Sequence, residues 1–224
     1  IWHDGYEADY WVAMPNKTGI TTLPDKRRGS PVLNYGKPKD MVLAKTIHKD
    51  GHKVETQILH YDGYWKGYSY QWNDTQTDAA LVRREGLNTT ISGEPYRFPS
   101  RDECIRCHSS NFNRPLAFLP GQMNRDGQLK KFHGLGIVDD VFVEIAKAQP
   151  LTDPLDETQP IELRARSWIH SNCSHCHKVS GGSGLTAQMN TAVPTSSMEL
   201  INFQPNKGYF GLEGAPQIDP GNPY

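Results

Sequence analysis

The sequence has no long hydrophobic run, no excess of charge of one sign and few apolar residues. No apolar stretch approaches the roughly 18 residues that a membrane-spanning helix needs, so we expect no membrane span. The 24 basic residues are balanced by 25 acidic ones and are spread along the chain. A nucleic-acid-binding surface needs a concentrated basic patch, so we expect no nucleic-acid partner. Only 36% of the 224 residues are hydrophobic, below the about 45–50% of typical domains, a figure that also counts glycine. We therefore expect something besides side chains to fill part of the core.

Cysteine is also scarce, and all four cysteines lie in two copies of the pattern C-x-x-C-H. This spacing is the attachment motif of c-type haem. Each cysteine would form a thioether with one haem vinyl group, and the adjacent histidine would bind the iron as its proximal ligand. The first motif contains Cys104, Cys107 and His108, and the second contains Cys173, Cys176 and His177. The sequence therefore predicts two covalently attached, iron-containing c-type haems.

Zinc binding, a disulfide framework and a thioredoxin-like redox motif fit the four cysteines less well. Zinc sites built from two C-x-x-C pairs usually have about 15–20 residues between the pairs, whereas 65 residues (108–172) separate Cys107 from Cys173. A disulfide framework would spread its cysteines over the fold instead of placing them in two short segments. A thioredoxin-like redox motif usually occurs once, beside a βαβ pattern.

The predicted cofactor also predicts a compartment. Haem c is attached on the outer side of the energy-transducing membrane, after export. The sequence starts at Ile1 and shows no positively charged segment followed by an apolar stretch, as a signal peptide would. We therefore expect a mature or clipped chain that works in the periplasm or outside the cell.

The pattern changes near residue 98, and we expect an α+β fold in two parts. Residues 1–98 should form a small antiparallel β-rich module, and residues 99–224 a mostly helical, loop-rich dihaem cytochrome c part. In the first part, runs of β-forming residues are separated by turns at Lys49-Asp50-Gly51 and Asp62-Gly63. Asp-Gly between such runs favours a hairpin. The expected strands are Met41–His48, His52–Tyr61 and Tyr64–Trp72.

Helix start signals lie in both parts. Asn73-Asp74 can cap a short helix over Thr75–Arg84. Ser100 and Glu103 form an S-x-x-E capping box directly before the first motif, so the helix that follows should carry the motif. Pro160 is favoured at a first helical position and should start a longer helix that runs into the second motif. Two further helices are expected over Asp126–His133 and Val141–Lys147, and a loop over Gly208–Tyr224.

Six runs of sequence resemble a largely uncharacterised dihaem cytochrome c-like family. They are Val54–Leu59, Gly67–Asn73, Thr77–Ala79, Pro99–His108, Gly121–Arg125 and Ala165–His177. Members of this family occur alone or attached to propeller domains that resemble sugar dehydrogenases, and the similarity covers roughly residues 35–224. The resemblance implies a β module followed by a cytochrome-like helical part, and a role in electron transfer.

The sixth ligand of each iron sets the reduction potential. His170 lies seven residues before His177, which is about 10 Å along one face of a continuous helix, so the two cannot bind one iron from opposite sides. We therefore expect His170 to ligate the haem of the first motif, which would place the two irons close together. The alternative is a packed, hydrogen-bonded helix residue. For the haem of the second motif we favour His133, with Met123, Met189 and Met198 as alternatives.

A histidine from a neighbouring chain is a further alternative for the sixth ligand. His3 lies near a terminus, and His48 and His52 flank a hairpin turn. Each is expected to be an ordinary surface residue, unless it ligates a haem of the next subunit. Such ligation would make the chain a homopolymer.

These expectations describe a protein that carries single electrons outside the cytoplasm. Its partners would be redox donor and acceptor proteins or neighbouring copies of the chain, in the second case as the repeating subunit of an extracellular electron-conducting filament. A dihaem peroxidase-type enzyme would instead need one iron with an open distal position and acid–base groups beside it. A third alternative is an electron-accepting partner of a periplasmic dehydrogenase.

Overall fold

The chain combines an antiparallel β-sheet region with helices, so the predicted α+β class is confirmed. The computed structural model describes residues 6–24, 33–108, 116, 118–178, 187–209 and 211–222. By their contacts the residues divide into two compact units. The sheet unit comprises Trp2–Leu119 and Arg125–Ile145, and the C-terminal unit comprises Pro120–Asn124 and Ala146–Tyr224.

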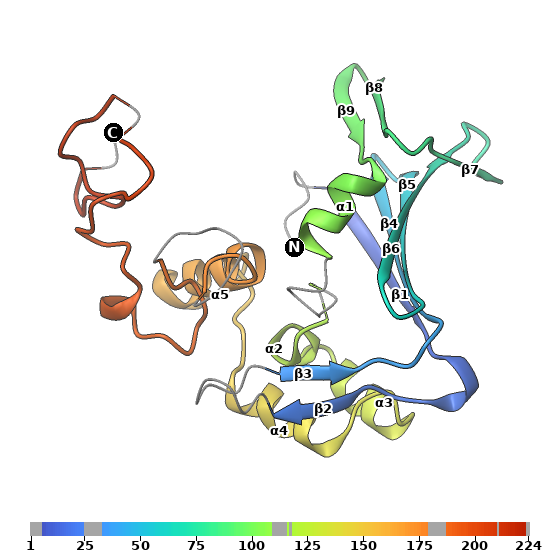
Figure 1. Cartoon of the computed structure of the whole chain (residues 1–224), viewed down its shortest axis with the longest axis horizontal. Coiled ribbons are helices and arrows are strands. Elements are labelled where there is room, and N and C mark those ends of the chain that lie inside the picture. Colours follow the sequence, from blue (N-terminus) through green and yellow to red (C-terminus); the bar gives the residue numbers. More distant parts are fainter. Residues whose placement is uncertain are drawn as a thin grey trace. The chain divides into compact units, whose positions relative to one another are not determined.

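The sheet unit is built around a five-stranded antiparallel sheet in the order β1-β4-β5-β6-β7 (Figure 1). Its strands are β1 (Glu7–Ala13), β4 (Met41–Lys49), β5 (His52–Tyr61), β6 (Trp65–Trp72) and β7 (Ala79–Leu81). Two smaller antiparallel pairs are β2 (Thr21–Pro24) with β3 (Leu33–Gly36), and β8 (Leu87–Ile91) with β9 (Glu94–Phe98). The three predicted strands are therefore confirmed. Asp50 and Gly51 join β4 to β5 with φ angles of 51° and 76°, as a two-residue type I′ turn requires.

The helix predicted over Thr75–Arg84 is wrong, because a tight turn leads directly from β6 into β7. The Asn73 side-chain Oδ1 accepts the backbone N–H of Thr77 at 3.0 Å. The backbone N–H of Gln76 donates to the Asn73 carbonyl at 3.0 Å, and Gln76 has a φ of 60°. Asn side chains can support a turn as readily as a helix start, and here the turn closes a strand pair.

The helices are α1 (Arg101–Cys107), α2 (Pro120–Met123), α3 (Gln128–Gly134), α4 (Asp140–Ala148) and α5 (Ile161–Cys173), with 3₁₀ turns at Pro15–Lys17 and Thr195–Ser197. α1 carries the first motif, and α3 and α4 correspond to the helices predicted near residues 126–133 and 141–147. Pro160 is the N-cap of α5, which ends at Cys173, so His177 lies beyond the helix. Among the described residues, no helix combines the length and the apolar character that crossing a bilayer requires.

The contacts group α1 and α3 with the strands. α1 packs on β6, and residues 125–145 also belong to the sheet unit. The change of sequence pattern at residue 98 therefore does not coincide with the boundary between the two compact units. The predicted division into a β-rich module and a haem-bearing part also concerns cofactor binding, and it stays a prediction.

The two units differ in how they bury apolar side chains. Large side chains such as Phe98 and Phe142 are fully buried in the sheet unit. In the described part of the C-terminal unit, the buried cluster consists of Ala187, Met198 and Leu200. Large apolar side chains of this unit are exposed at Leu155, Ile161, Leu163, Trp168, Ile201, Phe203, Tyr209, Leu212 and Ile218. The described part of the C-terminal unit therefore leaves many large apolar side chains exposed.

Candidate functional site

The first motif begins on a firmly fixed helix start. Ser100 Oγ accepts the backbone N–H of Glu103 at 3.1 Å, and Glu103 Oε2 accepts the backbone N–H of Ser100 at 2.7 Å. The predicted capping box is thus confirmed. Arg97 Nη2, on β9, donates to the same Glu103 oxygen at 2.8 Å. The Arg97 and Ser100 hydrogen bonds lower the pKa of Glu103 to about 2. The start of α1 is therefore held to β9 by a carboxylate that stays ionised at neutral pH.

Cys104 packs directly on the sheet, against the glycine at position 67 of β6. A Cβ atom placed on Gly67 of β6 would lie 2.5 Å from Cys104 Cβ and 2.8 Å from its Sγ. A glycine is therefore required beneath this cysteine. Burial raises the pKa of the Cys104 thiol to about 11, with a further contribution from the negative charge of Glu55. At neutral pH the thiol is protonated, which makes it a weak metal-thiolate ligand and a slow partner in disulfide exchange.

Cys107 and His108 complete the first motif at the end of α1. Cys107 lies one turn after Cys104, so the two thiols share one side of the helix. His108 is the C-cap residue, and its backbone N–H donates to the Cys104 carbonyl at 3.0 Å. The two thiols and the imidazole are therefore presented together, as attachment of one haem requires.

The second motif forms a tight turn at the end of α5. The backbone N–H groups of Cys176 and His177 both donate to the Cys173 carbonyl, at 3.1 and 2.9 Å. Burial raises the pKa of the Cys173 thiol. None of the four cysteines forms a disulfide bond. Both motifs thus place two available thiols and one histidine within a single turn.

His177 has the properties of a metal-binding imidazole. Within the part of the chain that the structure describes, its Nδ1 atom is buried without a hydrogen-bond partner. A buried polar atom without a partner costs free energy unless a ligand or a water molecule bonds to it. Burial also lowers the pKa of His177, which favours the neutral imidazole that binds metal. Together with Cys173 and Cys176 in the same turn, this residue fits a c-type haem.

His170 lies in the C-terminal unit with the second motif. Its Nδ1 atom accepts the backbone N–H of Thr191 at 3.1 Å. A neutral imidazole that accepts at Nδ1 carries its proton on Nε2, so Nε2 could bind iron only after this hydrogen bond is given up. Because α5 ends at Cys173, His170 and His177 do not share one continuous helix face. Its predicted ligation of the first haem would join the two units, and it stays a prediction.

His133 lies in the sheet unit with the first motif. Its Nε2 atom is 2.8 Å from Asp140 Oδ1, and both side chains are exposed. An exposed pair of this kind contributes little to stability, so a stronger ligand could replace Asp140. Its predicted ligation of the second haem would again join the two units and stays a prediction.

The methionine alternatives all belong to the C-terminal unit. The backbone N–H of Met189 donates to the His177 carbonyl at 3.0 Å. Met198 is buried, and the guanidinium of Arg166 contacts its sulfur. Arg166 also donates to the carbonyls of Asn190, at 3.1 Å, and of Val193. Of the predicted ligands, the structure therefore brings His170, Met123, Met189 and Met198 into one unit with the second motif, and His133 into one unit with the first.

The histidines considered as ligands between subunits lie mostly on the sheet. His48 Nε2 is 2.9 Å from Asp9 Oδ2 across β4 and β1. His52 is exposed at the start of β5. His3 lies outside the described residues.

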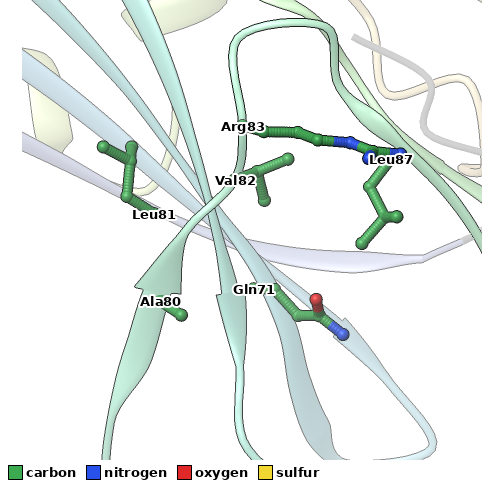
Figure 2. Close-up of a pocket in the computed structure, with 6 residues that line it drawn as sticks. All are labelled: Gln71, Ala80, Leu81, Val82, Arg83 and Leu87. Carbon is green, nitrogen blue, oxygen red and sulfur yellow. The ribbon is translucent and has the colours of Figure 1, made fainter.

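A shallow pocket lies in the sheet unit, and no motif residue lines it. Figure 2 shows its lining residues, which are Gln71, Ala80, Leu81, Val82, Arg83 and Leu87. Arg83 Nε donates to the Gly86 carbonyl at 2.9 Å. The lining contains neither histidine nor cysteine, so this pocket is not a candidate for binding iron.

Sequence reasoning missed Gly67 and Arg166. An isolated glycine inside a strand pattern often marks a close approach of two backbones, and this signal could have identified Gly67. No comparable signal marks Arg166, because its partners are mostly backbone carbonyls of a segment far along the chain.

Comparison with known proteins adds no assignment. No protein-family model, no curated protein and no solved structure matches this chain.

Proposed function

We propose that the chain is a dihaem c-type cytochrome that carries single electrons between redox proteins outside the cytoplasm. The observation that carries the proposal is the pair of complete C-x-x-C-H motifs, each folded into one turn with its cysteines outside any disulfide. Two thiols and a histidine within one turn match what covalent haem attachment needs. A bound haem would supply an iron that takes up and releases one electron.

The chain's own residues would attach and orient each haem. Cys104 and Cys107 would form thioethers at the first site, and Cys173 and Cys176 would do so at the second. Each bond forms by addition of the S–H group across a vinyl group, so the protonated thiol of Cys104 already carries the hydrogen that the addition consumes. His108 and His177 would then be the proximal ligands. The capping box and Arg97 would fix the first site to the sheet.

The composition of the C-terminal unit supports the proposal. Its described buried cluster is small, and large side chains such as Leu155, Ile161 and Leu212 are more than 60% exposed. Exposed apolar side chains in such number favour a missing apolar partner. A covalently bound macrocycle would give these side chains a surface to pack against.

The experiment is to express the chain in a host that attaches haem c and to count haems per chain by mass spectrometry and the pyridine haemochrome assay. We expect two. Replacement of Cys104 and Cys107 by alanine should leave one, and the matched replacement of Cys173 and Cys176 should also leave one. A chain that carries no covalent haem, or that binds one zinc ion through both cysteine pairs, would refute the proposal.

A further inference from the structure

A fully buried carboxylate lies in the sheet that carries the first motif. Glu55 on β5 is 0% exposed. Its Oε1 atom accepts the Ser69 hydroxyl at 2.6 Å, and its Oε2 atom accepts the Tyr96 hydroxyl at 2.7 Å. Burial of a carboxylate is costly, and the hydrogen bonds offset only part of that cost. The haem-attachment chemistry described above gives this residue no role.

The strand register places Glu55 on the same face of the sheet as the first motif. β5 and β6 are antiparallel, with Glu55 opposite Gln71 and Gln57 opposite Ser69, and the next pair in this alternation contains Gly67. Side chains of paired residues, and of every second pair, share one face. Because Cys104 lies on Gly67, the Glu55 carboxylate and the first motif occupy the same side of the sheet. The charge of Glu55 contributes to the raised pKa of the Cys104 thiol.

The surroundings of Glu55 have opposing effects on its pKa. Burial, the largest effect, raises its pKa. Hydrogen bonds from Ser69, Tyr96 and Gln57 and the charge of Lys45 on β4 lower it. In the haem-bearing protein Cys104 would be a thioether without a proton to lose, so the titratable groups that act with Glu55 are Lys45 on β4 and Tyr96 on β9. In this balance, one additional charge in the same low-dielectric region changes how readily the carboxylate takes up a proton.

We propose that Glu55 is a proton site coupled to the redox state of the haem held by Cys104 and Cys107, an inference that rests on the proposed function. Glu55 takes one proton from water when one electron arrives at that haem from a donor protein. It releases the proton when the electron leaves. The proton's positive charge therefore offsets the electron's negative charge on reduction, and both leave on oxidation. The coupling is reciprocal, so protonation of Glu55 also makes reduction more favourable.

The coupling predicts a pH-dependent reduction potential for one of the two haems. Across the pH range in which Glu55 changes protonation, the midpoint potential should fall as the pH rises. The largest slope for one proton per electron is about 59 mV per pH unit, because a tenfold change in proton concentration shifts the potential of a one-electron couple by this amount. The dependence is expected at the haem of the first motif, because that motif shares the Glu55 face of the sheet.

The test is a spectroelectrochemical titration of the two-haem protein over a range of pH values. In Glu55→Gln, we expect the slope of the first haem to be lost, and in Tyr96→Phe we expect the sloping region to move to higher pH, because one hydrogen bond to the ionised carboxylate is removed. Glu85→Gln is the matched control, since it removes the same charge at an exposed position and should leave the slope unchanged. Infrared difference spectra of the unsubstituted protein should also show a carboxylic acid band that appears on reduction.

Each outcome separates the coupling from the proposed function. Two attached haems whose potentials do not change with pH would leave the function standing and overturn the coupling. A slope that persists in Glu55→Gln would also overturn it. If that variant does not fold, two other results would overturn the coupling. One is the absence of the carboxylic acid band in the unsubstituted protein, and the other is a sloping region that does not move in Tyr96→Phe. A chain without covalent haem would overturn both proposals.

Discussion

Replacement of Gly67 by alanine should destabilise the sheet unit where α1 packs on β6. The new Cβ atom would lie 2.5 Å from Cys104 Cβ, an atom fixed to the backbone of α1. Overpacking of this kind typically costs about 1–3 kcal/mol, and alanine regains only about 0.5–1 kcal/mol over glycine in a strand. Neither backbone can move away easily, so we take the upper part of the overpacking range. After the gain from alanine is subtracted, the free energy of unfolding should fall by about 1–2 kcal/mol.

The assay combines thermal unfolding with a haem count. For a chain of this length, about 1–2 kcal/mol corresponds to a fall in Tm of roughly 2–8 °C. Mass spectrometry should show unchanged haem loading at both motifs, because attachment is expected to precede the docking of α1 on β6. Gly134→Ala is the matched control, because a Cβ atom there meets no neighbour among the described residues. An unchanged Tm in Gly67→Ala would refute the reasoning.

The remaining predictions concern titration, reactivity and ligation. The stability contributed by ionised Glu103 should be lost as the pH falls from about 4.5 toward about 2, since its folded-state pKa is depressed to about 2; in acid unfolding curves, Glu103→Ala should lack that dependence. In the haem-free chain, Cys104 should be alkylated about 100-fold more slowly at pH 8 than an ordinary thiol, because a rise in pKa from 9.0 to about 11 reduces the thiolate fraction by that factor; rapid labelling in the folded chain would contradict this. Arg166→Ala should lower hydrogen-exchange protection in residues 187–198 by about 1–3 kcal/mol, the worth of charged hydrogen bonds to backbone carbonyls; unchanged protection would show that the guanidinium does not hold the segment. Near-infrared magnetic circular dichroism should show His/His ligation at both irons, with one such signal lost in His170→Ala; a His/Met signal at both irons would rule out the histidine assignment.

Local sequence signals predicted those elements whose cause is local. Asp50-Gly51 predicted a hairpin because few dipeptides adopt two consecutive positive φ angles. Ser100 and Glu103 predicted the start of α1 because each satisfies a backbone N–H of the other. Asn73 was misassigned because its side chain can serve a turn or a helix start, and the choice depends on whether β7 pairs with β6.

Features that depend on distant parts of the chain could not be predicted from sequence. A glycine inside a strand pattern can mark Gly67 as a point of close approach, but that Cys104 is the neighbour follows only from the packing of α1 on β6. Glu55 looks like an ordinary strand residue until Ser69 and Tyr96 are placed around it. The position of Arg166 depends on where the segment containing Asn190 and Val193 returns to α5.

The contact between Cys104 and Gly67 implies an order of events during biogenesis. Once α1 has docked, one side of the Cys104 thiol faces the β6 backbone, and the space on that side is closed. On the proposed function, a maturation enzyme would have to reach both thiols of the motif to join them to one porphyrin. We therefore expect attachment to precede docking, so that the sheet closes over a cysteine that is already modified. The sheet unit would then pack completely only around a correctly attached porphyrin, because a wrongly attached one would keep α1 from docking on β6.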